Sequence, residues 1–115
     1  MDSPPALNLG VDIAGGKRSL SLLNPVMVAS GTFSYGIEYA KLIDVQRLGA
    51  IVSKTTTLRP RAGSPTQRID ETPAGMLNSI GLQNIGMSKL IRDMAPAWAR
   101  WKVPVIVSIL GSSAE

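Results

Sequence analysis

Lys54 directly follows a short apolar run, residues 50–53, whose composition is typical of a strand buried on both faces. Two other apolar runs also have small polar residues at their ends, namely residues 30–32 (Ser-Gly-Thr) after the first and residues 108–112, which lie at and after the end of the last. Parallel α/β proteins bind ligands where their strands end. A lysine in a low-dielectric pocket stabilises developing negative charge, while hydroxyls and backbone amides can bind the carbonyls and ring nitrogens of a flat heterocycle. We therefore predict a ligand site around Lys54.

Each of these residues also has a purely structural interpretation. Residues 30–32 can cap a turn and the helix that follows it. The three threonines at 55–57 can simply continue the strand, because threonine favours strands. Lys54 can extend to the rim of the sheet with its aliphatic stem along apolar surface. The residues alone leave both interpretations open.

A second candidate lies in the long connection formed by residues 55–85. Connections of more than about 12–15 residues are usually functional or disordered. Residues 75–84 (Gly-Met-Leu-Asn-Ser-Ile-Gly-Leu-Gln-Asn) are too apolar for a disordered linker, and Gly81 permits close approach of the backbone. Amide side chains that can both donate and accept hydrogen bonds, as recognition of a ring amide or a carboxylate requires, stand at Asn78, Gln83 and Asn84.

The elements that must position these residues alternate between strand and helix. Runs rich in β-branched residues predict three parallel strands, at residues 25–29, 50–53 and 104–109. Residues 37–48 and 87–101 carry apolar side chains at helical spacing and predict the helices between them. This order is the signature of a parallel sheet with right-handed crossovers.

Glycine and proline mark the ends of these elements. Gly49 is expected to end the first helix, and Pro96 is expected to kink or restart the second, because proline removes a donor and clashes with the preceding turn. Before the first parallel strand, residues 7–11 and 20–22 predict a β-hairpin joined through residues 14–17.

After the third strand, Ser112 and Glu115 have the spacing of a capping box, which predicts the start of another helix. A three-stranded parallel sheet with two helices would leave bare edges and apolar faces. We therefore expect residues 1–115 to be one part of a larger α/β domain, with residues 1–6 disordered.

Composition excludes several classes of protein. The chain has 115 residues, no cysteine and no histidine, so it lacks both a disulfide framework and the usual nitrogen and sulfur ligands of zinc. No apolar run reaches the roughly 20 residues that span a bilayer, and the first residues do not read as a signal peptide. The net charge of +4 is spread along the chain, without the aromatic residues that nucleic-acid binders use for stacking. We expect a cytoplasmic, metal-free protein that binds neither nucleic acid nor membrane.

Three stretches of the sequence resemble the dihydroorotate dehydrogenase family. They are residues 24–32 (Asn-Pro-Val-Met-Val-Ala-Ser-Gly-Thr), residues 49–61 (with Ser-Lys-Thr-Thr-Thr-Leu-Arg-Pro-Arg) and residues 71–84 (Glu-Thr-Pro-Ala-Gly-Met-Leu-Asn-Ser-Ile-Gly-Leu-Gln-Asn). The chain is most similar to class 1 members of the type that works with an electron-transfer partner subunit and NAD. The flavin barrel of dihydropyrimidine dehydrogenases is the nearest competing resemblance.

The resemblance implies the N-terminal portion of a TIM (β/α)8 barrel, with about three βα units preceded by a β-hairpin. It implies FMN at the strand ends and oxidation of dihydroorotate to orotate in pyrimidine (UMP) biosynthesis. Ser30, Lys54, Thr55 and Ser108 would contact the flavin. Residues expected to line the orotate site are Lys54, Asn78, Ser79, Ile80, Gly81 and Leu82.

The resemblance also implies what this chain does not supply. The family's catalytic base, a cysteine in class 1 or a serine in class 2, is expected beyond Glu115, so none of the 115 residues is assigned as catalytic. The flavin phosphate site is expected beyond it too. Ser108 departs from the partner-dependent type, which commonly has an asparagine there.

Implied partners are dihydroorotate or orotate, a subunit with FAD and an iron–sulfur cluster that passes electrons to NAD, and further copies in an oligomer. A fragment of the barrel that no longer catalyses anything is the alternative from another functional class.

Overall fold

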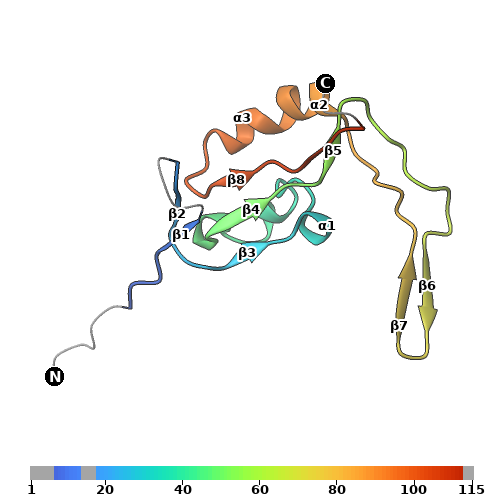
Figure 1. Cartoon of the computed structure of the whole chain (residues 1–115), viewed down its shortest axis with the longest axis horizontal. Helices are drawn as coiled ribbons and strands as arrows, with labels where there is room; N and C mark the ends of the chain where they lie inside the picture. The colour runs from blue at the N-terminus through green and yellow to red at the C-terminus, as the bar shows by residue number, and fades with distance from the viewer. Residues whose placement is uncertain (1–6, 14–17, 113–115) are drawn as a thin grey trace.

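The computed structural model describes residues 7–13 and 18–112 of the chain. The expectation for residues 1–6, the turn at residues 14–17 and the Glu115 end of the capping box lie outside the described residues. Figure 1 shows a small sheet with a helical segment along one side and a β-hairpin that projects from the other.

Three parallel strands form the centre of the structure. They are β3 (Met27–Val28), β4 (Ala50–Val52) and β8 (Val105–Ile106), in the order β3-β4-β8. Met27 pairs with Ala50, and Ile51 pairs with Val105. The predicted parallel sheet is therefore confirmed at all three positions. Ala50 and Ile51 of the central strand are fully buried, as expected for a strand that is covered on both faces. Met27 on the edge strand is exposed.

The sheet continues past its centre through a second, smaller pair of strands. β5 (Thr56–Thr57) runs parallel to β9 (Ile109–Leu110), with Thr56 opposite Ile109. Thr56 and Thr57 therefore do continue the line of β4, as one of the two interpretations predicted. Thr56 is fully buried, and its hydroxyl donates to the Lys54 carbonyl at 3.0 Å.

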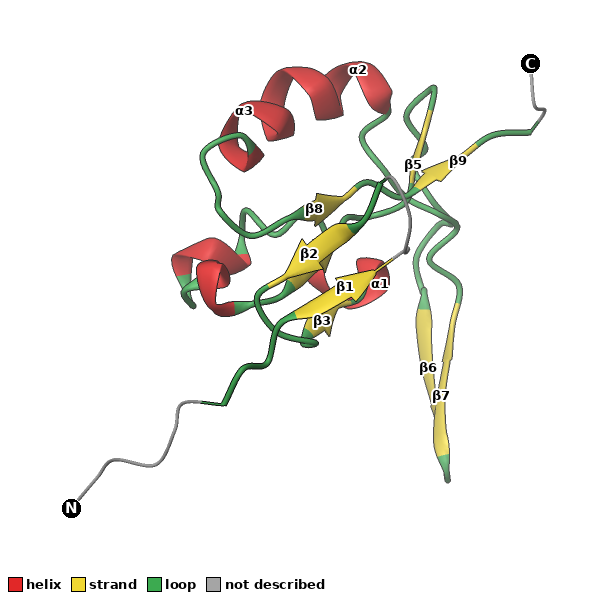
Figure 2. Ribbon diagram, turned by 60° about the vertical axis from the view of Figure 1, so that its left-hand side comes forward, coloured by secondary structure: helices red, strands yellow, loops and turns green. Residues whose placement is uncertain are grey.

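The N-terminal hairpin is present but shifted along the chain. β1 (Val11–Ile13) pairs antiparallel with β2 (Leu20–Leu22), so the first strand begins where residues 7–11 were expected to end. Figure 2 shows the two strands side by side, next to β3.

The predicted helix at residues 37–48 is wrong. A four-residue helix α1 (Ser30–Phe33) comes first, followed by two short 3₁₀ turns, η1 (Tyr39–Lys41) and η2 (Val45–Arg47). Asp44 separates the turns, because its backbone is extended and its carboxylate accepts from the Gln46 N–H at 3.0 Å. Periodic spacing predicted a helix here, but Leu42 and Ile43 remain exposed and Val45 alone is buried.

Gly49 also has a different role from the one expected. A Cβ at this position would lie 1.9 Å from the Asn24 carbonyl oxygen, and the Gly49 N–H donates to the Val26 carbonyl at 2.8 Å. Gly49 is required because the segment before β3 crosses it closely, and not because it ends a helix.

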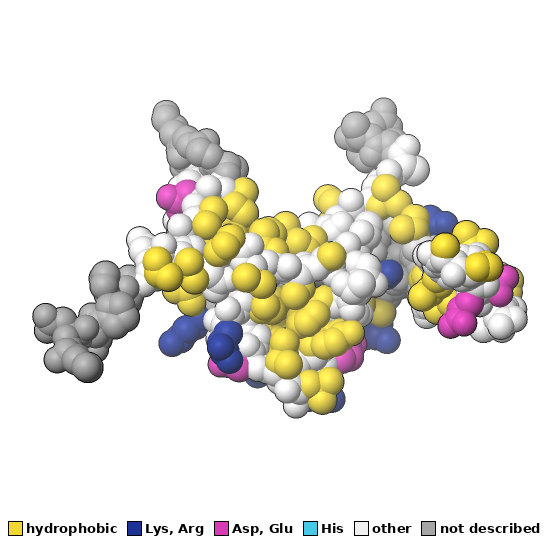
Figure 3. Space-filling model, turned by 90° about the horizontal axis from the view of Figure 1, so that it is seen from below, with side chains coloured by type: hydrophobic (Ala, Val, Ile, Leu, Met, Phe, Trp, Pro, Cys, Tyr) yellow, Lys and Arg dark blue, Asp and Glu magenta, His cyan; other side chains and the backbone are white. Residues whose placement is uncertain are grey.

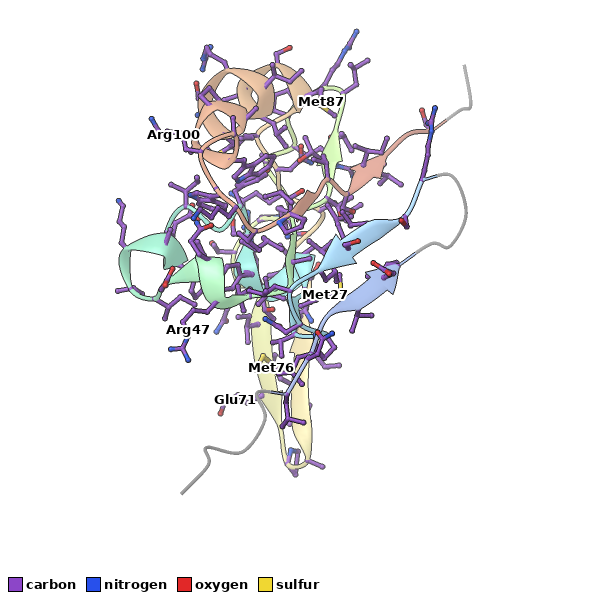
Figure 4. All side chains as sticks on the ribbon, turned by 90° about the vertical axis from the view of Figure 1, so that its left-hand side faces the viewer. Met27, Arg47, Glu71, Met76, Met87 and Arg100 are labelled. Atoms are coloured by element: carbon purple, nitrogen blue, oxygen red, sulfur yellow. The ribbon has the colours of Figure 1, made fainter. Side chains whose placement is uncertain are left out.

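The second predicted helix is confirmed as a continuous helical segment with a wider turn inside it. The segment consists of α2 (Met87–Lys89), a π-helical turn η3 (Leu90–Met94) and α3 (Ala95–Trp98). Pro96 stands in the first turn of α3, so the helix restarts at the proline as expected. Figure 4 shows this segment, from Met87 toward Arg100, on the opposite side of the sheet from Glu71 and Met76.

Two clusters of buried side chains hold the helical segment and the loops to the sheet. Phe33, Val45, Ile51 and Val103 form one cluster. Tyr35, Leu90 and Trp98 form the other, and the Trp98 indole N–H donates to the Tyr35 carbonyl at 2.9 Å. Because α1 and the residues after it belong to these clusters, packing fixes the loop that follows β3 against the ends of the strands.

Between β5 and α2 the chain forms a second antiparallel hairpin. β6 (Ile69–Thr72) pairs with β7 (Gly75–Asn78), and every residue of both strands is exposed. Figure 3 shows its acidic side chains at one end of the molecule and a broad apolar area on the face seen from below. The sequence interpretation missed this hairpin, although proline at the second position of Thr72-Pro73-Ala74-Gly75 is a standard turn signal.

Candidate ligand site at the strand ends

The three parallel strands bring their carboxyl ends to one edge of the sheet. Ser30 follows β3, Lys54 follows β4 and Ser108 follows β8, each two residues beyond the strand. The Lys54 N–H donates to the Ser34 carbonyl at 2.7 Å, which ties the lysine backbone to the loop after α1. All three residues are half-buried, so their side chains stand at the rim of the sheet.

A pair of hydroxyls links two of these strand ends. Thr55 Oγ1 and Ser108 Oγ lie 2.8 Å apart, and the Ser108 N–H donates to Ser53 Oγ at 3.3 Å. Thr55 and Ser108 are 53 residues apart in the sequence. The structure therefore brings together two residues that the sequence analysis assigned to the same site. Each hydroxyl oxygen keeps a lone pair for a further hydrogen bond.

A cavity of about 440 Å³ opens beside Lys54. Its volume falls within the range of about 300–1,000 Å³ usual for small-ligand sites. Of the residues predicted to contact the flavin or the substrate, Lys54 and Ile80 border it, whereas Ser30, Thr55, Ser108, Gly81 and Leu82 do not. Four other residues that the sequence singled out also border it, namely Gly31, Thr32, Gln83 and Asn84. Its walls come from the loop after β3, the end of β4 and the long connection, and the residues are Gly31, Thr32, Ser34, Tyr35, Tyr39, Lys54, Arg61, Ile80, Gln83, Asn84 and Ile85.

Asn78 and Ser79 lie elsewhere. Asn78 is the last residue of β7, pairs with Ile69 and is exposed. Both residues border a separate depression of about 340 Å³, together with Arg68 and Leu77. The structure does not bring them into the cavity beside Lys54.

Gly81 and Leu82 form a tight bend between these two regions. Gly81 has φ of 75° and Leu82 has φ of 54°, both in the left-handed range. A Cβ on Gly81 would lie 2.5 Å from Ser64 N, so the close backbone approach expected there is made to Ser64. The N–H groups of Ile80, Gly81 and Leu82 find no acceptor among the described residues. The bend therefore presents consecutive free donors, which suit a carboxylate.

The amide of Asn84 is fully engaged within the chain, contrary to the expectation from sequence, whereas Gln83 engages its amide oxygen. Gln83 Oε1 accepts from the Arg68 guanidinium, whose other nitrogens donate to the carbonyls of Ser64 and Ala62. Asn84 is buried and hydrogen-bonds within the chain. Both amides hold the long connection in shape.

Four residues that matter to this geometry escaped the sequence interpretation as site residues. Tyr35 accepts from the Ile85 N–H through its hydroxyl at 3.2 Å, and Tyr39 donates to the Thr32 carbonyl at 3.0 Å. Arg61 borders the cavity beside Lys54, and Arg68 braces the bend from outside it. The partner of Tyr35 lies 50 residues away in the sequence, so no local pattern marks that residue.

The clearest electrostatic perturbation lies away from the cavity. Arg92 Nε and Asp93 Oδ1 are 2.6 Å apart on the helical segment. The hydrogen bond from Arg92 lowers the pKa of the Asp93 carboxyl, and the same bond raises the pKa of the guanidinium. Both groups are exposed, so this pair belongs to the solvated face of the helix.

Within residues 7–13 and 18–112, no helix has the length and apolar character needed to cross a membrane. The same residues hold no cluster of three or more carboxylates that could bind a metal ion.

The fold and the site together define an α/β chain with a ligand cavity at the carboxyl ends of its parallel strands. Comparison with known sequences narrows this class: the dihydroorotate dehydrogenase family model matches residues 14–115. The chain belongs to the dihydroorotate dehydrogenase family.

Curated relatives are closely similar. A protein from Desulforudis audaxviator (strain MP104C), named dihydroorotate dehydrogenase B (NAD(+)), catalytic subunit, is 55% identical over 105 residues, which are 91% of this chain and 33% of the relative. Proteins with the same name from Desulforamulus reducens and Bacillus caldolyticus are 51% and 50% identical, over 95% and 93% of this chain and 34% and 33% of their own lengths. The chain spans about a third of the length of these relatives.

Proposed function

We propose that the full-length protein oxidises dihydroorotate to orotate, a step of de novo pyrimidine biosynthesis, with FMN as its cofactor. The family match over residues 14–115 carries this proposal. The three parallel strands would be the first part of a TIM barrel, with Lys54 at the end of its second strand. This chain would supply part of the active site, and the base that takes the proton would come from elsewhere in the full-length protein.

The cavity residues fit a flavin ring. The space beside Gly31 is open, because a Cβ there would have no atom within 4 Å. Lys54 adds a positive charge and the linked hydroxyls of Thr55 and Ser108 add polar contacts beyond it. Of the residues proposed to hold FMN, Lys54 borders the cavity, whereas Ser30, Thr55 and Ser108 lie at neighbouring strand ends outside its lining. The flavin, when bound, supplies the chemistry of hydride acceptance.

The residues of this chain would then orient the substrate and compensate its charge. The Lys54 ammonium supplies a fixed positive charge in a partly dry site, where it is worth more than in water. The free N–H groups of Ile80, Gly81 and Leu82 suit the carboxylate of dihydroorotate. For Asn78 and Ser79 to contact the same ligand, the segment after β7 would have to turn toward Lys54 when the ligand binds.

The names of the relatives suggest which molecule finally accepts the electrons. The relatives are named as catalytic subunits of an NAD(+) type. We propose that this protein also works in the cytoplasm as an oligomer, beside a second subunit with FAD and an iron–sulfur cluster that passes electrons to NAD.

The test uses the full-length protein loaded with FMN. Anaerobic addition of dihydroorotate is expected to bleach the visible flavin absorbance and to produce orotate. Dihydrouracil, which lacks the carboxylate, is the control, and we expect it to bleach the flavin far more slowly. Equal or faster bleaching by dihydrouracil would move the protein to the dihydropyrimidine dehydrogenase type. Failure to bind FMN would refute the flavoenzyme proposal and support a non-catalytic relative.

A further inference from the structure

Asn84 has an unusually complete set of hydrogen bonds for a side chain in a loop. It is 6% exposed and stands at the end of the long connection. Its Oδ1 accepts from the N–H groups of Thr57 at 3.2 Å and Gly86 at 2.9 Å. Its Nδ2 donates to the Leu82 carbonyl at 2.9 Å and to Thr57 Oγ1 at 3.0 Å. Both amide hydrogens and both acceptor positions are therefore occupied.

These bonds connect the sheet to the bend. Thr57 belongs to β5, three residues after Lys54, whereas Leu82 belongs to the bend whose first residue, Ile80, borders the cavity. The backbone reinforces this connection, because Asn84 and Arg61 exchange N–H···O bonds of 3.0 Å in both directions. Asn84 thus fixes the distance between the strand end and the bend.

Leu82 requires such support. A leucine with φ of 54° occupies a left-handed conformation that costs roughly 1–2 kcal/mol for residues other than glycine. Residues persist in such conformations when their surroundings hold them there. The bond from Asn84 Nδ2 to the Leu82 carbonyl supplies that restraint directly.

We propose that Asn84 is a positioning residue for the substrate. It holds Leu82 in its left-handed conformation and so aims the N–H groups of Ile80, Gly81 and Leu82 at the substrate carboxylate. Its amide hydrogens and acceptor positions are all used within the chain, so Asn84 would act through Leu82. This inference rests on the proposed oxidation of dihydroorotate, and the experiments below separate the two.

The first variant is Asn84→Asp in the full-length protein. The shape of the side chain is kept, but an ionised carboxylate cannot donate, so the Leu82 carbonyl loses its partner and faces a like charge. Loss of one buried partner costs about 1–3 kcal/mol, which corresponds to a change of about 5- to 150-fold. We expect KM for dihydroorotate to rise about 10- to 100-fold, with kcat changed less than about threefold.

Asn24→Asp is the matched control. Asn24 also accepts a local N–H, from Val26 at 3.0 Å, and donates to a distant carbonyl, that of Arg47 at 3.0 Å. It lies in the segment before β3, at the opposite end of the strands from Lys54. We expect Asn24→Asp to leave KM unchanged. A rise in KM as large as that of Asn84→Asp would mean that any loss of a loop hydrogen bond produces the effect, and would overturn the proposal.

A double-mutant cycle with Leu82→Gly tests the mechanism. Glycine adopts the left-handed conformation without strain, so it removes the need for the restraint. In the Leu82→Gly background, Asn84→Asp is therefore expected to raise KM by less than about threefold. An undiminished rise in that background would show that Asn84 does not act through Leu82.

Two further measurements cover the remaining outcomes. If Asn84→Asp does not fold, Thr57→Val removes the hydroxyl that accepts from Asn84 Nδ2, and an unchanged KM would count against the proposal. If the unmodified protein does not oxidise dihydroorotate, the proposed function fails. Amide hydrogen exchange of the Ser64 N–H, which donates to the Ile80 carbonyl of the bend, then decides about Asn84: exchange at least about tenfold faster in Asn84→Asp supports the restraint, and equal exchange refutes it.

Discussion

Gly81→Ala tests whether the bend at residues 80–82 forms part of the substrate site. Gly81 has φ of 75°, and a Cβ would lie 2.5 Å from Ser64 N and 2.6 Å from Ser64 Oγ. These contacts are shorter than real Cβ atoms make, and the nearest atom belongs to the backbone. Alanine therefore forces the bend away from Ser64.

The magnitude follows from two contributions. The left-handed conformation costs about 1–2 kcal/mol for alanine. Movement of the bend also breaks the Ser64 N–H bond to the Ile80 carbonyl, now 3.0 Å, which is worth about 1 kcal/mol. Substrate binding must restore the original bend, so about 2–3 kcal/mol appears in binding. We expect KM for dihydroorotate to rise about 30- to 150-fold.

The assay compares Gly81→Ala with Gly75→Ala in the full-length protein. Gly75 is exposed in the β6–β7 hairpin, and a Cβ there would approach only Thr72 Oγ1, at 3.7 Å. We expect Gly75→Ala to leave KM and the free energy of unfolding close to those of the unmodified protein. If both variants show the same KM, the bend does not contact the substrate and this part of the proposed site is refuted.

Three further predictions concern the sheet and the helical segment. Lys54→Met should slow flavin reduction by dihydroorotate about 100-fold in stopped-flow measurements, because a fixed positive charge is lost, and an unchanged rate would exclude Lys54 from the chemistry. Gly49→Ala should lower the free energy of unfolding in urea by about 3 kcal/mol, because its Cβ would lie 1.9 Å from the Asn24 carbonyl oxygen, and a small loss would contradict that close crossing. The lowered pKa of Asp93 means that any stability from its pair with Arg92 would be present at neutral pH and lost as pH falls through that lowered pKa. Because its pair with Arg92 is exposed, we expect Asp93→Asn to show no measurable change in unfolding at neutral pH, and a clear loss there would contradict this.

The order of strands and helices could be predicted because it depends on local patterns. Continuous β-branched runs mark β3, β4 and β8 whatever their neighbours are, and helical spacing with Pro96 marks the segment from 87 to 98. Residues 37–48 carry a similar spacing but form two 3₁₀ turns. In that segment Val45 is the buried residue, and Asp44 offers the backbone an alternative partner. A periodic pattern without enough buried partners does not make a helix.

The strand-end residues of the candidate site could be predicted for the same reason, since parallel strands place their carboxyl ends at one edge. Thr55 and Ser108 meet there at 2.8 Å. The roles of Arg68 and Asn84 could not be predicted, because their partners are set by how the long connection folds back on itself. An amide in a loop looks the same in a sequence whether it faces a ligand or a buried carbonyl.

The cavity therefore has two walls with different origins, and they should respond differently to substitution. Lys54 is held by the sheet and by a backbone bond to Ser34. The bend at residues 80–82 is held by a backbone bond from the Ser64 N–H to the Ile80 carbonyl and by side chains that bridge the long connection. Substitution at Lys54 should thus change the reaction rate while the bend stays intact. Substitution at Asn84 should change KM while the response of the flavin to saturating substrate stays intact. A full-length protein in which both substitutions produced the same kinetic defect would show that the two walls move as one unit.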